Sequence, residues 1–310
     1  MCQLYHENGE IVTECNAHSL RINKLNKLSV IENISMVECD NLNSSLSDLE
    51  IENKLLKCTE INDEQKTKLK NLICEFRHIF DKKPGLLNSY EHVLKLKDDT
   101  PFRVAPYPVP IKYQNEVRCE IEKMLKLGII RPVCAVIKKD GSVRLCLDAR
   151  KLNERLVNDN EAPVGIEEVL QKCRSIRVMS TIDLRSSYWQ IPLREESKKY
   201  TAFSVFGKCY EFNVAAYGIK TSGAALIRGL EKVTQQISDN LLNFVDDYVC
   251  ISKDFDLHLK HLRSLFQYFS DHNLTISFEK SFFAIGEVDF LGYKISPKGV
   301  SAQKEKLEVI

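Results

Sequence analysis

Apolar residues recur at every third or fourth position in four stretches of the chain, a spacing that gathers them on one face of a helix. We therefore expect helices from Asn62 or Asp63 to about residue 80, over residues 117–125, from Ser222 to Val233, and from Asp256 to Phe269. Gly128 follows the second of these stretches and is typical of a helix C-terminus.

Shorter apolar runs separated by turn signals predict pairs of strands. The pairs lie at residues 133–137 with 143–147, around 206–208, within 241–251 and around 290–293, and a further strand is expected at 178–183. Asp140 and Gly141 form the turn signal of the first pair. Hairpins are frequent and no regular alternation of strand, helix and strand appears. We therefore predict an α+β fold with a mostly antiparallel sheet and helices on one face.

Three segments are expected along the chain. Residues 1–60 are rich in Asn, Ser and Glu and show no sustained period, which indicates a loosely ordered leader or linker. No D-[ST]-G triplet of a protease occurs in this leader. Residues 61–95 form a helical segment, and residues 96–310 hold the mixed strands and helices.

Composition narrows the class of protein. The chain has 310 residues, of which 44% are hydrophobic and 28% charged, as in a globular protein. No apolar run approaches the roughly 18 residues that span a bilayer, and the N-terminus lacks a signal-peptide core. We therefore expect an intracellular location, cytoplasmic or nuclear, and no membrane partner. Eleven scattered cysteines without a C-x-x-C pair argue against a zinc site or a disulfide framework.

Charge is distributed unevenly. Of the 44 basic and 43 acidic side chains, residues 1–60 hold five and ten, so the positive excess lies in the rest of the chain. A basic body favours a nucleic-acid partner through phosphate contacts. Many ordinary enzymes have the same excess, so this feature alone does not decide the function.

Two adjacent acids, Asp246 and Asp247, interrupt a strand-forming run and are expected at the tip of a tight hairpin. Burying such a pair is costly unless a cation neutralises it. Asp183 closes another apolar strand and would supply a third carboxylate. Because two Mg²⁺ ions about 3.5–4 Å apart can hold a phosphoryl displacement, the set predicts a site for two Mg²⁺, with Mn²⁺ as the other candidate. By itself, an Asp-Asp pair in a turn is more often a solvated loop.

Four motifs in consistent order resemble the reverse transcriptase region of gypsy-type LTR retrotransposon Pol polyproteins. Residues 244–247 resemble the (Y/F)-x-D-D box, and residues 180–191 resemble the first aspartate motif. Residues 136–153 are similar to the fingers segment, and residues 281–296 to the segment that forms the primer grip. The resemblance covers most of the chain after residue 60. It implies the fingers and palm of a polymerase right hand, RNA-directed DNA polymerase activity, and a primed RNA or DNA template and dNTP as partners.

The resemblance also assigns roles to single residues. Asp183, Asp246 and, more weakly, Asp247 would coordinate the metal ions and carry catalysis, and Lys280 would be a general acid. The residues expected at the nucleotide are Lys138 or Lys139, Arg144, Tyr188, Tyr217 and Gly218, with the Tyr188 ring under the incoming sugar, where it would exclude a 2′-hydroxyl. The primer grip would consist of Leu291, Gly292 and Tyr293. Without the motifs, the same residues would be solvated hairpin charges, a half-buried strand aromatic and a sheet-edge hairpin.

Three departures from the family pattern bear on activity. Residues 128–136 lack the Ser/Pro-rich stretch that the family has before the fingers strand. The M-P-F-G-L-x-N-A-P box appears as residues 215–223 without its two prolines, so the loop that presents Tyr217 is expected to be less rigid. The family continues beyond the equivalent of Ile310 into a thumb and further domains, so we expect a thumbless chain that other Pol-derived domains could complement in trans. The alternative is a truncated, catalytically impaired transposon-derived protein that at most binds nucleic acid.

Overall fold

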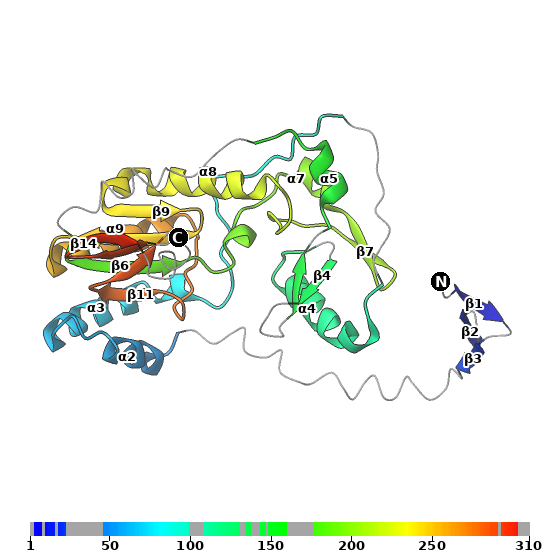
Figure 1. Cartoon of the computed structure of the whole chain (residues 1–310), viewed down its shortest axis with the longest axis horizontal. Helices are drawn as coiled ribbons and strands as arrows, with labels where there is room; N and C mark the ends of the chain where they lie inside the picture. The colour runs from blue at the N-terminus through cyan, green and yellow to red at the C-terminus, as the bar shows by residue number, and fades with distance from the viewer. Residues whose placement is uncertain are drawn as a thin grey trace. The chain divides into compact units, whose positions relative to one another are not determined.

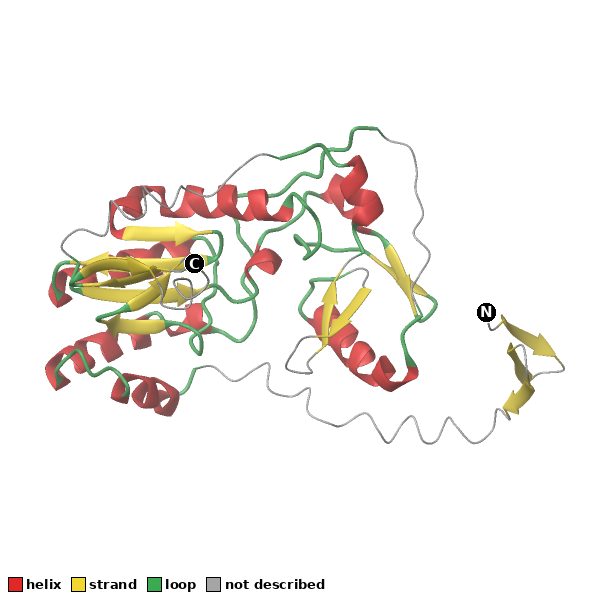
Figure 2. Cartoon of the chain, in the orientation of Figure 1, coloured by secondary structure: helices red, strands yellow, loops and turns green. Residues whose placement is uncertain are grey.

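A computed structural model describes residues 3–7, 10–15, 18–22, 46–98, 108–130, 134–137, 143–146, 148–159, 176–290 and 293–302. The chain separates into two compact units, Met1–Asn41 and Leu42–Ile310, and each is described by itself. Figure 1 labels the helices and strands of both units, and Figure 2 separates helices from strands by colour.

The first unit contains a small antiparallel sheet. Its strands β1 (Gln3–Glu7), β2 (Glu10–Cys15) and β3 (His18–Ile22) are hydrogen-bonded in sequence order. The expected leader extended to residue 60, whereas the structure assigns α2 (Asp48–Leu56) to the second unit, where Ile51 and Leu55 are part of its core. Ser47 and Glu50 form a capping box at the start of α2, a local signal that the residue pattern did contain.

The second unit is a mixture of helices and hairpins. Its α-helices are α2, α3 (Asp63–Glu75), α4 (Gln114–Lys126), α5 (Arg150–Arg155), α7 (Glu195–Lys198), α8 (Ser222–Thr234) and α9 (Phe255–Asp271). Its 3-10 helices are Arg77–Phe80, Ile111–Tyr113, Ser187–Gln190, Lys199–Thr201 and Gln235–Asn240. The four predicted helices are confirmed as α3, α4, α8 and α9. Two of them have side-chain N-caps: Asn62 and Asp254 accept backbone N–H bonds at the first turns of α3 and α9.

The strands of this unit form hairpins at the predicted places. They are β4 (Cys134–Ile137), β5 (Val143–Cys146), β6 (Val178–Asp183), β7 (Phe203–Val205), β8 (Lys208–Tyr210), β9 (Leu241–Phe244), β10 (Asp247–Ser252), β11 (Phe282–Ile285), β12 (Val288–Phe290), β13 (Tyr293–Ser296) and β14 (Gly299–Ala302). The largest sheet has the order β11-β6-β10-β9, and all its pairs are antiparallel. The predicted α+β class with an antiparallel sheet is therefore confirmed.

The four-stranded sheet is covered on both faces. Side chains alternate along each strand, so Ile182 and Cys250 face the core formed by α2, α3, α8 and α9. Val249 and Ile251 face a smaller cluster formed with β12 and β13. The helices thus cover one face of the sheet, as predicted, and Figure 1 shows α3, α8 and α9 next to its strands.

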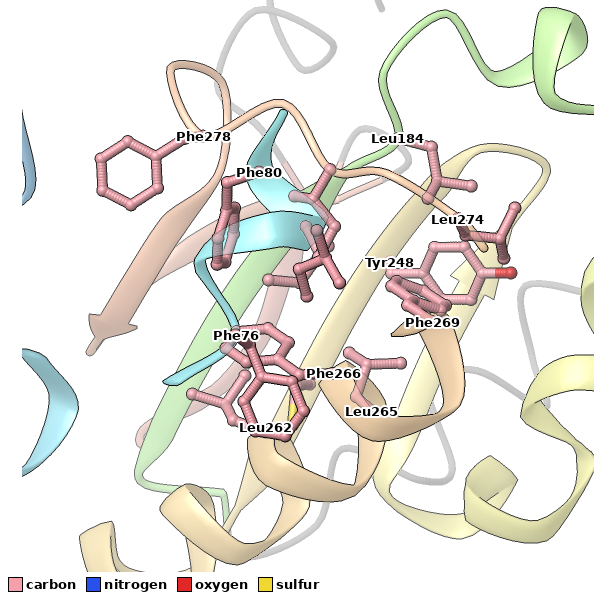
Figure 3. Close-up of a cluster of buried hydrophobic side chains, with 14 of the residues drawn as sticks. Phe76, Phe80, Leu184, Tyr248, Leu262, Leu265, Phe266, Phe269, Leu274 and Phe278 are labelled. Atoms are coloured by element: carbon pink, nitrogen blue, oxygen red, sulfur yellow. The ribbon is translucent and has the colours of Figure 1, made fainter. Parts of the chain in front are cut away.

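Aromatic rings fill the helix side of the sheet. Phe80 and Phe266 meet edge to face, with ring centroids 5.4 Å apart and planes at 89°. The Phe269 ring contacts Tyr248 of β10 in the same edge-to-face manner at 5.7 Å. Figure 3 shows these side chains between the helix α9 and the strands. The dense packing holds the sheet against α9 and so restricts the movement of the strand ends.

A second core lies away from this sheet in the chain's second unit. It joins α4 and α5 to the segment 212–219 through buried residues such as Met124, Leu152 and Phe212. Gly128 ends α4 with a positive φ of 71°, as the residue pattern predicts. In the part of the chain that the structure describes, no helix is long and apolar enough to cross a membrane.

Candidate functional site

Asp183 and Asp247 lie directly opposite each other at one end of the four-stranded sheet. Asp183 is the last residue of β6, Asp247 is the first residue of β10, and the antiparallel register pairs them. Val245 and Asp246 form the turn between β9 and β10, so the two adjacent acids lie at a hairpin tip as predicted. Val245 has a φ of 59°, which a β-branched residue rarely adopts. Such strain is typical of functional turns.

The backbone of Asp183 is held by the segment that leads into β11. Its N–H donates to Ser281 Oγ at 3.1 Å, and its carbonyl accepts the Ser277 N–H at 2.8 Å. Its side-chain atom Oδ1 is buried and has no hydrogen-bond partner among the described residues. The Lys280 ammonium lies 3.6 Å from that oxygen, and the Lys280 side chain is 70% exposed. Asp183 Oδ1 therefore makes no hydrogen bond among the described residues, and the exposed Lys280 can leave this oxygen to a ligand.

The electrostatics of the acid pair favour a bound cation. Burial raises the pKa of Asp183, against the nearby Lys280 charge, and the Asp246 charge adds to the rise. Asp247 is exposed, yet the surrounding chain still removes water from its carboxylate and raises its pKa, and the charges of Asp246 and Asp183 raise it further. A positive ion between these carboxylates would reverse both shifts by favouring the ionised forms.

Asp246 is held by a different contact. Ser187, which is buried, donates from its Oγ to Asp246 Oδ2 at 3.2 Å. Ser187 belongs to the 3-10 helix that follows β6. This bond therefore joins the turn between β9 and β10 to the segment after β6. The residue pattern did not single out Ser187 or Ser281 as supports: both lie within the recognised motifs, but a motif does not specify the hydrogen-bond partner of a serine.

The acids could supply some, but not all, of the ligands of a magnesium ion. Within the described residues, no group of three or more His, Cys, Asp and Glu side chains could hold a metal ion unaided. Magnesium usually binds one or two protein carboxylates and completes its octahedron with waters and substrate phosphates. The free oxygen of Asp183 and the raised pKa of the opposed Asp247 match that partial ligand set. The site fits an ion that arrives with a phosphate substrate.

An aromatic pair adjoins the acids. The rings of Tyr188 and Tyr217 meet at 77° with centroids 5.0 Å apart, and Trp189 lies 6.2 Å from Tyr217. Tyr188 is half-buried; burial raises its pKa, and the charge of Asp246 contributes to the rise. Tyr188 therefore contacts Tyr217 and lies within the electrostatic reach of Asp246, and its role at the nucleotide stays a prediction.

The loop that carries Tyr217 is tied by side chains. Gly218 has a φ of 98°, and its carbonyl accepts a bond from Asn153 Nδ2 at 2.8 Å. Asn153 Oδ1 accepts the Lys220 N–H at 2.9 Å, and Ser222 Oγ donates to the Ala216 carbonyl at 2.9 Å. These bonds constrain a loop that has lost the two prolines of the family pattern. The residue pattern did not identify Asn153 as their source.

A cavity of about 510 Å³ extends from the acids toward the last hairpins. Asp183, Asp247 and Lys280 line one end, and Val288 and Phe290 of β12 line the other. Tyr293 begins β13 and pairs with Phe290, so one of the predicted primer-grip residues belongs to the hairpin beside this cavity.

Several predicted site residues cannot be placed with the others. Lys138, Lys139, Leu291 and Gly292 lie outside the described residues. Arg144 is in β5 opposite Val136, but its side chain is not described. Their roles at the triphosphate and at the primer stay predictions.

Comparisons with known proteins bear on the class of this site. A family model described as "Reverse transcriptase (RNA-dependent DNA polymerase)" matches residues 136–295. The Drosophila melanogaster "Retrovirus-related Pol polyprotein from transposon 297" is 30% identical over 267 residues, which cover 81% of this chain and 25% of the polyprotein. The polyprotein from transposon gypsy of the same species is also 30% identical, over 70% of this chain and 22% of its own length. The chain thus spans about a quarter of the curated relatives that it matches.

Solved structures show the same fold. The foamy viral protease-reverse transcriptase in complex with double-stranded DNA has a TM-score of 0.78 at 22% identity, over 100% of this chain and 57% of that one. The same viral protein in complex with an RNA/DNA hybrid has a TM-score of 0.75 at 20% identity, over 99% and 43% of the two chains. Such low identity shows the fold alone, and the predicted fingers and palm are confirmed.

Proposed function

This chain belongs to the reverse transcriptase family and is a reverse transcriptase domain of a retrotransposon Pol protein; we propose that it extends a primer 3′-hydroxyl with dNTP on an RNA template by two-metal catalysis. The observation that carries this proposal is the opposition of Asp183 and Asp247 across β6 and β10, with Asp246 in the adjoining turn. Three carboxylates at one sheet end suit a reaction whose catalysis consists mostly of positioning and charge neutralisation.

The acids would hold Mg²⁺, or Mn²⁺ in its place. Asp183 and Asp246 are the proposed ligands, and Asp247 is a supporting carboxylate. When bound, the ions would lower the pKa of the primer 3′-hydroxyl and neutralise charge on the triphosphate and the leaving pyrophosphate. The chain itself aims the Oδ1 atom of Asp183, because Ser281 and Ser277 hydrogen-bond to the backbone of Asp183 and hold it in place.

The aromatic pair would select the sugar. Tyr188 stands beside the acids with its ring supported by Tyr217. A ring in that place, under the sugar of the incoming nucleotide, leaves no room for a 2′-hydroxyl and so favours dNTP over rNTP. Gly218 has no side chain, which allows the backbone of its loop to approach the nucleotide closely.

The cavity beside the acids would receive the primer end. It leads from Asp183 and Asp247 to β12, whose hairpin partner begins with Tyr293. Leu291 and Gly292 complete the proposed grip, while Lys138 or Lys139 and Arg144 would meet the triphosphate. The foamy viral structures of this fold are complexes with double-stranded DNA and with an RNA/DNA hybrid, which supports a primer-template partner. Further Pol-derived domains acting in trans are part of the same proposal.

Lys280 is the proposed general acid toward the leaving pyrophosphate. Its ammonium is 3.6 Å from Asp183 Oδ1 and largely exposed, so it can turn from that carboxylate to a phosphate. If so, Lys280→Ala lowers incorporation and Lys280→Arg restores part of it. If both variants and the unchanged chain incorporate nucleotide at the same rate, Lys280 is not a general acid and only balances the charge of Asp183.

Primer extension on poly(rA)/oligo(dT) with Mg²⁺ tests the proposal. Incorporation by the purified chain, absent from an Asp246→Asn/Asp247→Asn variant, supports it. No incorporation above that variant overturns it. A gel-shift measurement on the same primer-template identifies the alternative, since a catalytically impaired protein that only binds nucleic acid would shift the duplex without extending it.

A further inference from the structure

A buried polar network stands behind the acid pair, on the helix side of the sheet. His258 of α9 is fully buried, with Nε2 2.7 Å from Ser180 Oγ of β6 and Nδ1 3.0 Å from Ser252 Oγ at the end of β10. Ser252 Oγ also lies 2.8 Å from Nδ1 of His261. Polar groups in such a place are retained only where each has a partner.

The ring of His258 is fully satisfied. Both of its nitrogens face hydroxyl groups, which donate or accept as either neutral tautomer requires. Nδ1 of His261 also lies 3.2 Å from the Ile251 carbonyl, which only accepts, so that nitrogen carries the proton. Burial lowers the pKa of His258 to about 3, and the neighbouring His261 contributes to this. His258 is therefore neutral at working pH and serves as a fixed link between two strands.

Ser180 extends the network to a third strand. Its Oγ accepts the Ala284 N–H at 3.0 Å. Ala284 has a φ of 50° and lies where the pairing of β11 with β6 shifts register. At such a bulge a backbone N–H loses its partner in the ladder, and here the Ser180 hydroxyl replaces that partner. The network thus ties β11, β6 and β10 to one side chain of α9.

The three tied strands carry the candidate site. Asp183 is three residues beyond Ser180, about 10 Å along β6. Asp247 begins the strand that ends at Ser252, and Ser281, which binds the Asp183 N–H, comes directly before β11. A shift of β6 or β10 would move one acid relative to the other, and a shift of β11 would move the support of Asp183.

We propose that His258 is a positioning residue for the polymerase site, which holds β6, β10 and β11 in the register that sets Asp183 opposite Asp247. The inference rests on the proposed function of these acids. It differs from a purely structural role, because the loss of His258 should reduce the rate of the chemical step more than the binding of the nucleotide.

The test compares three replacements of His258 in the full chain. His258→Leu removes both polar contacts and is expected to lower kcat about tenfold with KM for dNTP changed less than about twofold. His258→Gln places an amide near the former Nε2 and keeps the bond to Ser180, so kcat should recover in part. His258→Asn places its amide near Nδ1, keeps only the bond to Ser252 and should recover less.

The matched control is Leu265→Ala. Leu265 is equally buried on the same helix and in the same core, and as a leucine it offers no polar side-chain contact. A loss of kcat in Leu265→Ala equal to that in His258→Leu, or a His258→Leu rate within about twofold of the unchanged chain, overturns the inference. If His258→Leu does not fold, Ser180→Ala is the second variant, with an expected loss of about threefold. Added to His258→Asn, which already lacks the bond to Ser180, it should cause a smaller further loss, and fully additive losses would overturn the inference.

Hydrogen exchange separates this inference from the proposed function. The amides of Ala284 and Asp183 are expected to exchange at least about tenfold faster in His258→Leu than in Leu265→Ala, compared at equal global stability. Equal exchange overturns the positioning role whether or not the chain polymerises. An unchanged chain without incorporation, but with this exchange difference, overturns only the polymerase function.

Discussion

The two sides of the candidate site are built in different ways. The acid side is fixed by strand register: Asp183 and Asp247 are partners in a four-stranded sheet whose two faces are covered. The aromatic side is fixed by side chains: Tyr188 is on a 3-10 helix, Tyr217 is on a loop, and their rings contact each other. We therefore expect the acid side to decide whether the reaction occurs and the aromatic side to decide which nucleotide is used.

The largest expected effect concerns the acids themselves. Asp183→Asn and Asp246→Asn should each lower primer extension about a thousandfold, since each removes a charge on which transition-state stabilisation depends. Asp247→Asn should cost only about tenfold, because Asp247 is a supporting carboxylate. The control is Asp256→Asn on α9, whose side chain is 79% exposed. Equal losses for all three site variants would contradict the unequal roles.

The next effect is on sugar selection. Tyr188→Ala should raise the use of rNTP relative to dNTP by about 10–100-fold, measured as the ratio of kcat/KM values, because a steric contact of this size is worth a few kcal/mol. Tyr188→Phe keeps the ring and should leave the ratio within about twofold. A large change in Tyr188→Phe would mean that the hydroxyl, not the ring, discriminates.

A smaller effect is expected at Tyr217, whose ring contacts that of Tyr188. An edge-to-face ring contact contributes about 0.5–1.5 kcal/mol, so Tyr217→Ala should change the rNTP/dNTP ratio about threefold while Tyr217→Phe leaves it unchanged. In a Tyr188→Ala background, Tyr217→Ala should have no further effect on the ratio. Additive effects would show that Tyr217 contacts the nucleotide independently.

The smallest effect is on stability and runs opposite to the effect on activity. Burial raises the folded-state pKa of Asp183 above that of the unfolded chain, so the ionised carboxylate destabilises the metal-free fold at neutral pH. Asp183→Asn should therefore raise the melting temperature by about 2 °C at pH 7 without metal. The gain should vanish as the pH falls through the folded pKa, where the carboxyl of the unchanged chain is protonated. Mg²⁺ with dNTP should stabilise the unchanged chain and not the variant, as thermal melts can show.

Local patterns account for most of the secondary structure. The N-cap Asn62, the turn before Asp246 and the strand that ends at Asp183 depend on neighbours within a few residues, and these elements are confirmed. The hydrophobic pattern did not predict the strands of the first unit or helix α2, because these elements are short. Helix α2 owes its stability to the burial of Ile51 and Leu55 in a core built from distant segments.

Within the site, the contacts that support the acids were not predictable. Ser187 and Ser281 lie within the recognised motifs, but each bonds a residue far away in the chain, and a motif does not specify that partner. The same holds for Asn153, which ties the loop of Tyr217. The same is true of His258, whose two serine partners come from different strands. Such contacts depend on strand register and helix packing, which the periodicity of one segment does not specify.

The sequence by itself identified the candidate residues for the chemistry: three carboxylates at strand ends or in the adjoining turn and an aromatic after the first of them, within motifs of one family. These are properties of short segments, and short-range physics is enough to place an acid at a turn. Only the tertiary structure decided that Asp183 faces Asp247, that Tyr188 rests against Tyr217, and that His258 ties three strands behind them. Pairings between distant segments form only when the whole core buries its apolar faces together, because that shared burial offsets the entropy of bringing them into contact.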